Sequence, residues 1–161
     1  MAKIQQNPSA VSSAGQKIAV IRLKGMFSIS PTVRTTLASL SLDRLYACTI
    51  VDDSASAKGM IQSCKDFVSF GPVEKESIAL LLAKRGKTTT GNRLSQAKKP
   101  EEIKKVLDEF LAGKKLAALG VSPVFYLAPP KGGFAGSRMS PKPFGPLGKN
   151  EKISELISRM A

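Results

Sequence analysis

One segment near the C-terminal end limits what this chain can fold into. Residues 128–150, APPKGGFAGSRMSPKPFGPLGKN, hold five glycines, five prolines, two phenylalanines and four cations, with no acidic residue. Prolines remove backbone donors and glycines offer no side chain to pack, so this composition predicts neither helix nor strand. Such a segment buries too little apolar surface to offset the entropy lost on ordering. We therefore expect something outside the protein to order it.

The residues that follow predict a loop rather than a tail. Ile153, Leu156, Ile157 and Met160 recur at helical spacing, and Asn150 is placed to cap this helix. A disordered tail would not carry such an apolar face. We expect a long loop that is held at both ends by folded elements.

Upstream of this segment, strand patterns alternate with helix patterns. Runs rich in β-branched residues predict strands over residues 17–25, 44–53 and 67–71, with a late strand over residues 124–128. Helices are expected over residues 30–42, 54–67, 72–86 and 100–113, and a basic loop over residues 87–99. Ser30 is the expected cap of the first helix, and Ser54 or Ser56 that of the second. This order predicts an α/β chain, an α+β sandwich of the ferredoxin-like, split βαβ kind.

The positive charge of the chain is concentrated in two stretches. The chain has 25 basic and 12 acidic residues, a formal charge of +13. Residues 77–100 and residues 110–150 contain no acid and six cations each, which together supply twelve of the thirteen excess charges. Lysines that only keep a surface soluble can stand among acidic residues, so solubility does not explain why these stretches contain none. We therefore expect a polyanionic partner: nucleic acid first, an anionic membrane surface second. Phe134 and Phe144 are placed either to stack on unpaired bases or to pack back on the domain.

The sequence features that could indicate a catalytic site do not meet the requirements of one. The chain has no histidine, the commonest general base and metal ligand. The sequence GKTTTG around Lys87 lacks the glycine of a phosphate-binding loop, because Leu81 stands there. Asp52 and Asp53 are neighbours on a strand and point to opposite faces, so capping the next helix is their expected role. We predict no enzyme, no cofactor, no metal site and no small-molecule substrate.

The remaining features place the chain in a reducing compartment. Its longest apolar run, residues 78–83, is far shorter than a membrane span, and its start lacks the apolar stretch of a secretory signal. We expect a cytoplasmic protein without a membrane partner. Cys48 and Cys64, the two cysteines, are expected to be small core side chains rather than a disulfide or half of a metal site.

Five stretches in the right order resemble one protein family. They are VRTTLASLSL, IVDDSASAKGMIQSCKDFVSFG, IALLLAKRG, FYLAPPKGGFAG and PLGKNEKISELISRM. They are similar to the L thirty family of large-subunit ribosomal proteins, in its archaeal and eukaryotic branch. The last two resemble an extension specific to that branch. The chain departs from the family pattern where Lys58 replaces a usual arginine, which keeps phosphate attraction but loses bidentate recognition.

The resemblance implies a structural, rRNA-binding constituent of the large ribosomal subunit. It implies a three-stranded antiparallel sheet with helices on one side, and an extension that packs beside it. The expected division is a tail over residues 1–16, a core over residues 17–86 and the extension over residues 87–161. The expected partners are large-subunit rRNA, with 5S rRNA a candidate neighbour, and adjacent ribosomal proteins.

Charge and resemblance together give the candidate RNA-binding residues. They are Arg34, Lys58, Gly59, Lys84, Arg85, Lys87, Arg93, Lys131, Phe134, Arg138, Lys142, Phe144 and Lys149. Folded rRNA is then what orders residues 128–150. The alternative is a free-standing RNA- or DNA-binding module, such as an RNA chaperone or a chromatin-type protein, which composition alone does not separate from a ribosomal role.

Overall fold

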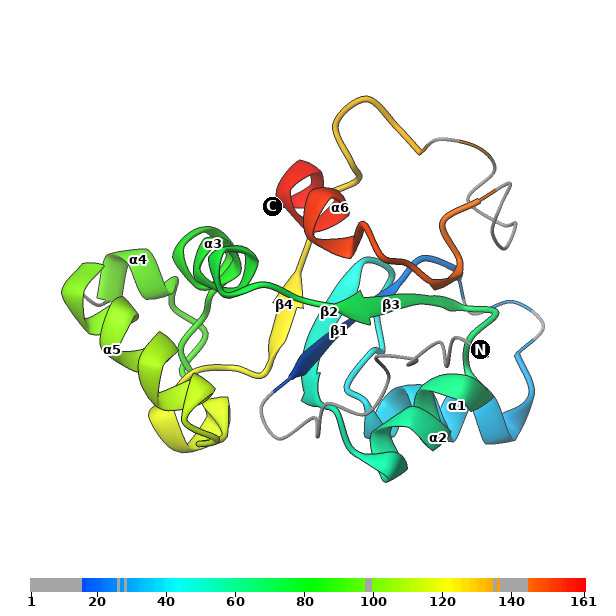
Figure 1. The fold of residues 1–161 in the computed structure, drawn as a ribbon, viewed down its shortest axis with the longest axis horizontal. Helices are drawn as coiled ribbons and strands as arrows, with labels where there is room; N and C mark the ends of the chain where they lie inside the picture. Colours follow the sequence, from blue (N-terminus) through cyan, green and yellow to red (C-terminus); the bar gives the residue numbers. More distant parts are fainter. Residues whose placement is uncertain (1–15, 26, 28, 98–99, 135, 137–144) are drawn as a thin grey trace, which may run out of the picture.

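The structure is a computed structural model that describes residues 16–25, 27, 29–97, 100–134, 136 and 145–161 (Figure 1). In chain order the elements are β1 (Lys17–Arg22), α1 (Pro31–Ser39), β2 (Ala47–Asp52), α2 (Ala55–Ser63), β3 (Val68–Pro72), α3 (Lys75–Arg85), α4 (Leu94–Ala97), α5 (Pro100–Leu111), the short 3-10 helix η1 (Leu116–Leu119), β4 (Val124–Tyr126), β5 (Gly148–Lys149) and α6 (Ile153–Met160). The predicted α+β class and split βαβ core are confirmed.

A single sheet organises the chain, with strand order β4-β2-β1-β3-β5. Strands β1, β2 and β3 form the expected antiparallel three-stranded core. Residues after position 86 widen it at both edges, because β4 pairs antiparallel with β2 and β5 pairs parallel with β3. The extension is therefore part of the sheet and does not merely pack beside it. The proposed boundary at residue 86 stays a prediction.

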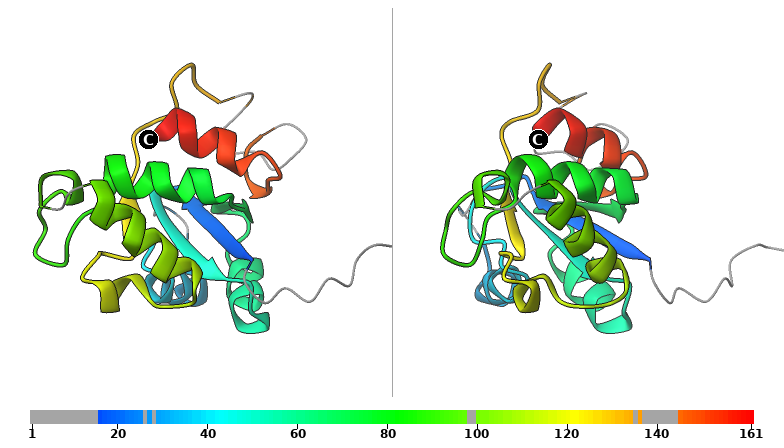
Figure 2. Two further views of the ribbon diagram at one scale, coloured as in Figure 1. Left: turned by 60° about the vertical axis from the view of Figure 1, so that its left-hand side comes forward. Right: turned by 90° about the vertical axis from the view of Figure 1, so that its left-hand side faces the viewer.

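Helices cover both faces of the sheet, which corrects the expectation of helices on one side (Figures 1 and 2). One face carries Val20, Ala47 and Val68 against α1 and α2. The other carries Ile21 and Cys48 against α3, α5 and α6. The physical reason lies in β1, whose run IAVI is apolar at consecutive positions. Since successive side chains point to opposite faces, both faces of this strand require cover.

The local signals at the helix ends gave mostly correct predictions. Ser30 caps α1 through its hydroxyl and Ser54 caps α2 in the same way, accepting the amide hydrogen of Ala57 at 3.1 Å. Because Ser54 is the cap, the capping role expected for Asp52 and Asp53 is wrong; each pairs with a lysine instead. Asn150 does not cap α6 but closes the turn before it, where its Oδ1 accepts from the Lys152 amide at 3.1 Å.

Both ends of the proline- and glycine-rich segment are held by the protein itself. The Ala128 amide donates to the Met160 carbonyl at 3.0 Å, and the Lys131 amide donates to the Arg159 carbonyl at 3.1 Å. At the other end, residues 148–149 form β5, so the prediction that this segment contains no strand is wrong there. The hypothesis that only RNA orders the segment therefore fails for its two ends. Residues 135 and 137–144 lie outside the described part of the chain.

Gly71 shows how closely the extension fits the core. A Cβ at this position would fall on the backbone carbonyl oxygen of Asn150. Only glycine lets β3 lie against the chain just after β5. The packing of the extension thus depends on a glycine of the core.

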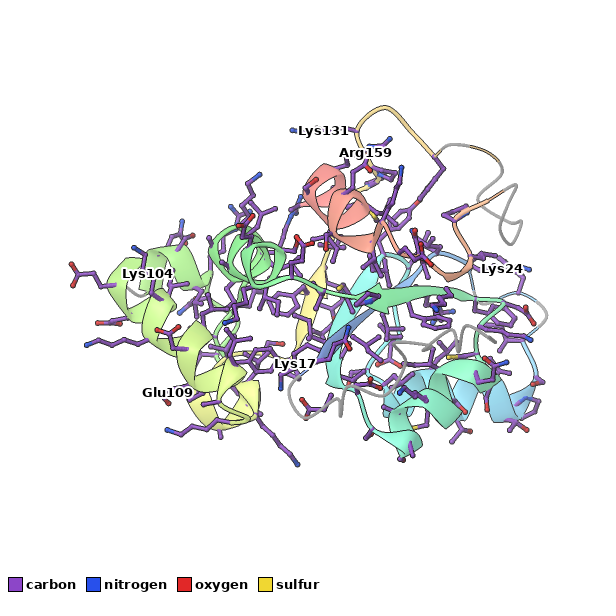
Figure 3. The ribbon with its side chains drawn as sticks, viewed as in Figure 1. Lys17, Lys24, Lys104, Glu109, Lys131 and Arg159 are labelled. Carbon is purple, nitrogen blue, oxygen red and sulfur yellow. The ribbon has the colours of Figure 1, made fainter. Side chains whose placement is uncertain are left out.

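Two basic side chains of β1 are buried and structural. The Arg22 guanidinium, 1 % exposed, donates to the carbonyls of Leu42, Asp43 and Lys24 at 2.7 to 3.0 Å. Burial lowers the pKa of Arg22 from its ordinary value. Lys17 pairs with Asp52 across the strands and lies 4.4 Å from the centroid of the Phe110 ring, which ties β1 to α5 (Figure 3).

The two cysteines are separate core residues, as predicted. Both are free and buried, and they pack on opposite faces of the sheet. Burial raises the pKa of Cys48 to about 12 and that of Cys64 to about 11, so both thiols stay protonated at neutral pH. Among the helices that the structure describes, none has the length and apolarity that crossing a membrane requires.

Candidate nucleic-acid interface

Four cations of the first acid-free stretch meet at one depression in the surface. We call it the Tyr126 cleft; it has a volume of about 580 Å³ and is lined by Ala83, Lys84, Arg85, Lys87, Arg93, Ser95, Tyr126 and Ala161. Lys84, Lys87 and Arg93 are exposed, and Arg85 is half-buried. No lining residue has an acidic side chain. The cleft is therefore a concave, basic surface at the β4 edge of the sheet.

The loop after α3 brings these cations together although they are up to nine positions apart. Helix α3 ends at Arg85, and the chain then reverses so that Lys87 and Arg93 face one another in an isolated antiparallel bridge. The Thr88 amide donates to the Asn92 carbonyl at 2.8 Å within this turn. The Ser122 amide donates to the Lys87 carbonyl at 2.9 Å and fixes the loop next to β4. Basic side chains from the end of α3 and from both sides of the following turn thus share one surface.

The cations of the cleft form no ion pair with an acidic side chain among the described residues. Within the described residues, ion pairs join Lys17 to Asp52, Lys58 to Asp53 and Lys114 to Glu109, and none involves a cation of the cleft. Like charges held near one another repel, so the cleft favours an anion that neutralises them. Phosphate groups are such anions, and arginine binds them through two parallel hydrogen bonds.

Tyr126 is an aromatic surface inside this basic cleft. It is 39 % exposed, whereas Val124, Phe125 and Leu127 beside it are buried. The Arg44 guanidinium lies over its ring at 5.5 Å from the centroid and the Lys87 ammonium at 5.6 Å. Sequence reasoning missed both Tyr126 and Arg44. The sequence held part of this information, because Tyr126 carries the only polar side-chain group, a hydroxyl, in the otherwise apolar strand β4.

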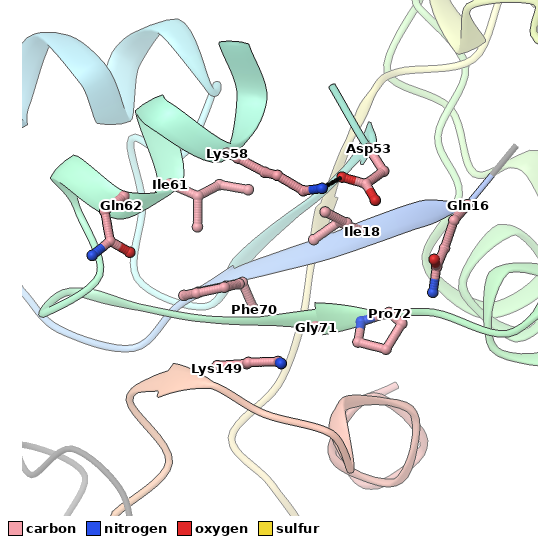
Figure 4. Close-up of a pocket in the computed structure, with 10 residues that line it drawn as sticks. All are labelled: Gln16, Ile18, Asp53, Lys58, Ile61, Gln62, Phe70, Gly71, Pro72 and Lys149. Atoms are coloured by element: carbon pink, nitrogen blue, oxygen red, sulfur yellow. Dashed lines mark ion pairs between the residues drawn. The ribbon is translucent and has the colours of Figure 1, made fainter. Parts of the chain in front are cut away.

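Two more of the predicted RNA-binding residues, Lys58 and Lys149, line a second depression in the surface (Figure 4). We call it the α2–β5 groove; it has a volume of about 560 Å³ and is lined by Gln16, Ile18, Asp53, Lys58, Ile61, Gln62, Phe70, Gly71, Pro72 and Lys149. Lys58 comes from α2 and Lys149 from β5. Lys58 Nζ pairs with Asp53 Oδ1 at 2.6 Å while its side chain remains 59 % exposed. The groove lies toward the opposite edge of the sheet from the Tyr126 cleft.

Nothing in the described part of the chain packs against the position of a side chain at Gly59. It is exposed in the middle of α2, and a Cβ built there would meet no atom within 4 Å. Glycine in a helix interior costs about 0.5 to 1 kcal/mol relative to alanine. The position therefore carries a stability cost that packing among the described residues does not explain.

The remaining candidates lie outside both depressions. Arg34 is exposed on α1. Lys131 is exposed next to the end of α6, where Arg159 donates to its carbonyl at 2.9 Å (Figure 3). Phe134 is half-buried against the core, so of the two roles left open for its ring the structure favours packing. Arg138, Lys142 and Phe144 lie outside the described residues.

Comparisons with known proteins indicate one family. The sequence model of the family described as ribosomal protein L30p/L7e matches residues 18–68. The large ribosomal subunit protein uL30 of Methanothrix thermoacetophila is 35 % identical over 148 residues, which cover 88 % of this chain and 98 % of the relative. The proteins of the same name from Methanobrevibacter smithii and Archaeoglobus fulgidus are 35 % and 32 % identical, over 88 % of this chain and 97 % and 98 % of theirs. The chain belongs to the uL30 family.

Membership of the uL30 family confirms the resemblance drawn from five short stretches. The family's sequence model covers β1 to the start of β3, whereas the archaeal relatives extend over most of the chain. Most of the extension after residue 86 thus lies within the length that these uL30 proteins share with it. The comparisons leave the individual contact residues as predictions.

Proposed function

We propose that this chain, a structural constituent of the large ribosomal subunit, binds rRNA through two separate surfaces, the Tyr126 cleft and the α2–β5 groove. One observation carries the proposal: the four cations of the acid-free residues 84–93 converge on one concave surface, and among the described residues none of them pairs with an acidic side chain. As a member of a family of structural ribosomal proteins, the chain is not an enzyme.

The two surfaces suit RNA in different ways. In the Tyr126 cleft, lysine and arginine side chains bind phosphates and release the counterions that those phosphates held. At α2, the exposed backbone at Gly59 lets a sugar-phosphate strand approach closely, with Lys58 next to it in the helix; Lys58 and Lys149 are the cations of the adjoining groove, which Gly59 itself does not line. Because the cleft and the groove lie toward opposite edges of the sheet, we expect them to contact different segments of rRNA.

Its partners are rRNA and neighbouring ribosomal proteins, and the site of action is the ribosome in the cytoplasm. The uL30 relatives are named as proteins of the large ribosomal subunit. Proximity to the 5S rRNA is a further part of the proposal. Crosslinking within purified large subunits tests it: crosslinks to 5S rRNA support proximity, and crosslinks to the large rRNA alone contradict it.

Sedimentation tests the ribosomal role. The protein is tagged at its N-terminus, and a lysate is run through sucrose gradients at moderate and at high salt. We expect migration with the large subunit at moderate salt and release by ribonuclease. Recovery in the light fractions, or spread over all RNA, would contradict the proposal and favour a free-standing RNA-binding module.

A further inference from the structure

We propose that the Tyr126 cleft takes an unpaired nucleotide of the rRNA, whose base stacks on the Tyr126 ring while the cleft cations bind its phosphates. This inference rests on the proposed function and deepens it, because it specifies the kind of RNA that the cleft recognises. A surface of cations alone would bind any duplex backbone.

The first step of the argument is that the Tyr126 ring is exposed without a packing reason. Its strand neighbours Val124 and Phe125 are fully engaged in the core, and Tyr126 itself is 39 % exposed. A leucine or threonine would fill an edge position of the strand equally well. An exposed ring in a basic cleft is what stacking on a base requires.

The second step is the placement of the cations about the ring. Arg44 and Lys87 lie over it, with 5.5 and 5.6 Å between charge and centroid. A base that stacks on the ring displaces a cation from that face, and the long, flexible side chain then reaches the phosphate of the same nucleotide. The Arg44 guanidinium is planar and adds a second surface on which a base can stack.

The third step concerns size and access. The cleft volume of about 580 Å³ lies within the range of sites that hold small organic molecules, so one nucleotide fits it. A paired base does not reach the ring, because its faces are covered by its neighbours in the stack. The cleft therefore selects a bulged, looped-out or terminal nucleotide over continuous duplex.

The experiment compares two RNA hairpins that differ in one nucleotide. One carries a single bulged 2-aminopurine, and the other is fully paired. We measure the affinity of the full chain for each and the quenching of 2-aminopurine fluorescence on binding. We expect the bulged hairpin to bind about 5- to 100-fold more tightly than the paired one, with quenching that reports stacking.

Substitutions assign this preference to one ring. Tyr126→Leu removes the preference and the quenching, whereas Tyr126→Phe keeps both. Phe27→Leu, a matched change at an aromatic residue that is 94 % exposed elsewhere, leaves both unchanged. Thermal melts of each variant verify that it is folded.

The outcomes separate this inference from the proposed function. If both hairpins bind with steep salt dependence but equally well, or if Tyr126→Leu keeps the preference, the stacking inference is wrong and rRNA binding stands. If neither hairpin shows salt-dependent binding, rRNA binding through the cleft fails, and the stacking inference fails with it.

Discussion

The substitution Gly59→Ala is expected to raise the stability of the free protein and to weaken its binding to RNA. The residue is exposed and fifth in the nine-residue helix α2, and a Cβ there meets no atom within 4 Å. Alanine therefore gains the helix propensity that glycine lacks, about 0.5 to 1 kcal/mol, without a steric cost. For a chain of 161 residues this raises Tm by about 1 to 4 °C.

The same methyl group is expected to weaken RNA binding. If rRNA backbone lies against α2 at Gly59, the methyl intrudes into a close contact, which costs about 1 to 3 kcal/mol, or about 5- to 150-fold in affinity. Calorimetry of the free protein measures the first effect, and competition with wild type for large-subunit rRNA measures the second. Gly25→Ala is the matched control, because its Cβ also meets no atom within 4 Å. It is expected to leave RNA affinity unchanged.

Two results would refute this reasoning separately. A variant that is more stable and binds RNA like wild type would remove α2 from the interface. A variant that is less stable would show that Gly59 has a structural requirement that the geometry does not reveal.

Three further substitutions test the fold and its charges. Gly71→Ala sets its Cβ on the Asn150 carbonyl and should lower the free energy of unfolding by about 1 to 3 kcal/mol, seen as a lower Tm; an unchanged Tm contradicts the account of β5 docking. Arg22→Leu leaves three carbonyls without their charged donor and should cost about 2 to 4 kcal/mol in denaturant unfolding, whereas a neutral result means that water replaces the guanidinium. Because burial raises the pKa of Cys48 from 9.0 to about 12, its thiol stays protonated in the folded state, and stability should fall as the pH rises above 9, where the thiol of the unfolded chain ionises; Cys48→Val should make this fall shallower and leave the part that comes from Cys64, and parallel pH curves would contradict this.

Local patterns predicted most of the helices and strands. The apolar face of α6 and the serine caps of α1 and α2 depend on residues within a few positions of each other, and the structure has them as expected. The widening of the sheet by β4 and β5 was not predictable in this way. It depends on pairings between distant segments, such as residues 69–70 with 148–149, for which no local signal exists.

The candidate site was predictable in its charge but not in its shape. Absence of acids marked residues 84–93 as a basic surface, yet the bridge between Lys87 and Arg93 and the position of Tyr126 follow from tertiary contacts. Arg44 was missed because it lies outside the acid-free stretches, and only the fold brings it to the Tyr126 ring. Conversely, Lys114 lies in an acid-free stretch but pairs with Glu109, so sequence alone overstates its availability.

The salt dependence of binding to large-subunit rRNA tests the central claim most directly. The triple variant Lys84→Gln, Lys87→Gln, Arg93→Gln removes three charges from the Tyr126 cleft. The control Lys104→Gln, Lys105→Gln, Lys115→Gln removes three exposed charges in and after α5, none of them in an ion pair within the described residues, and gives the same net charge. We predict that the cleft variant makes the negative slope of log K against log salt shallower by about 0.7 to 0.9 per lost phosphate contact and that the control leaves the slope as in wild type. Equal slopes for both variants would show that net charge, and not the cleft, determines how this protein binds RNA.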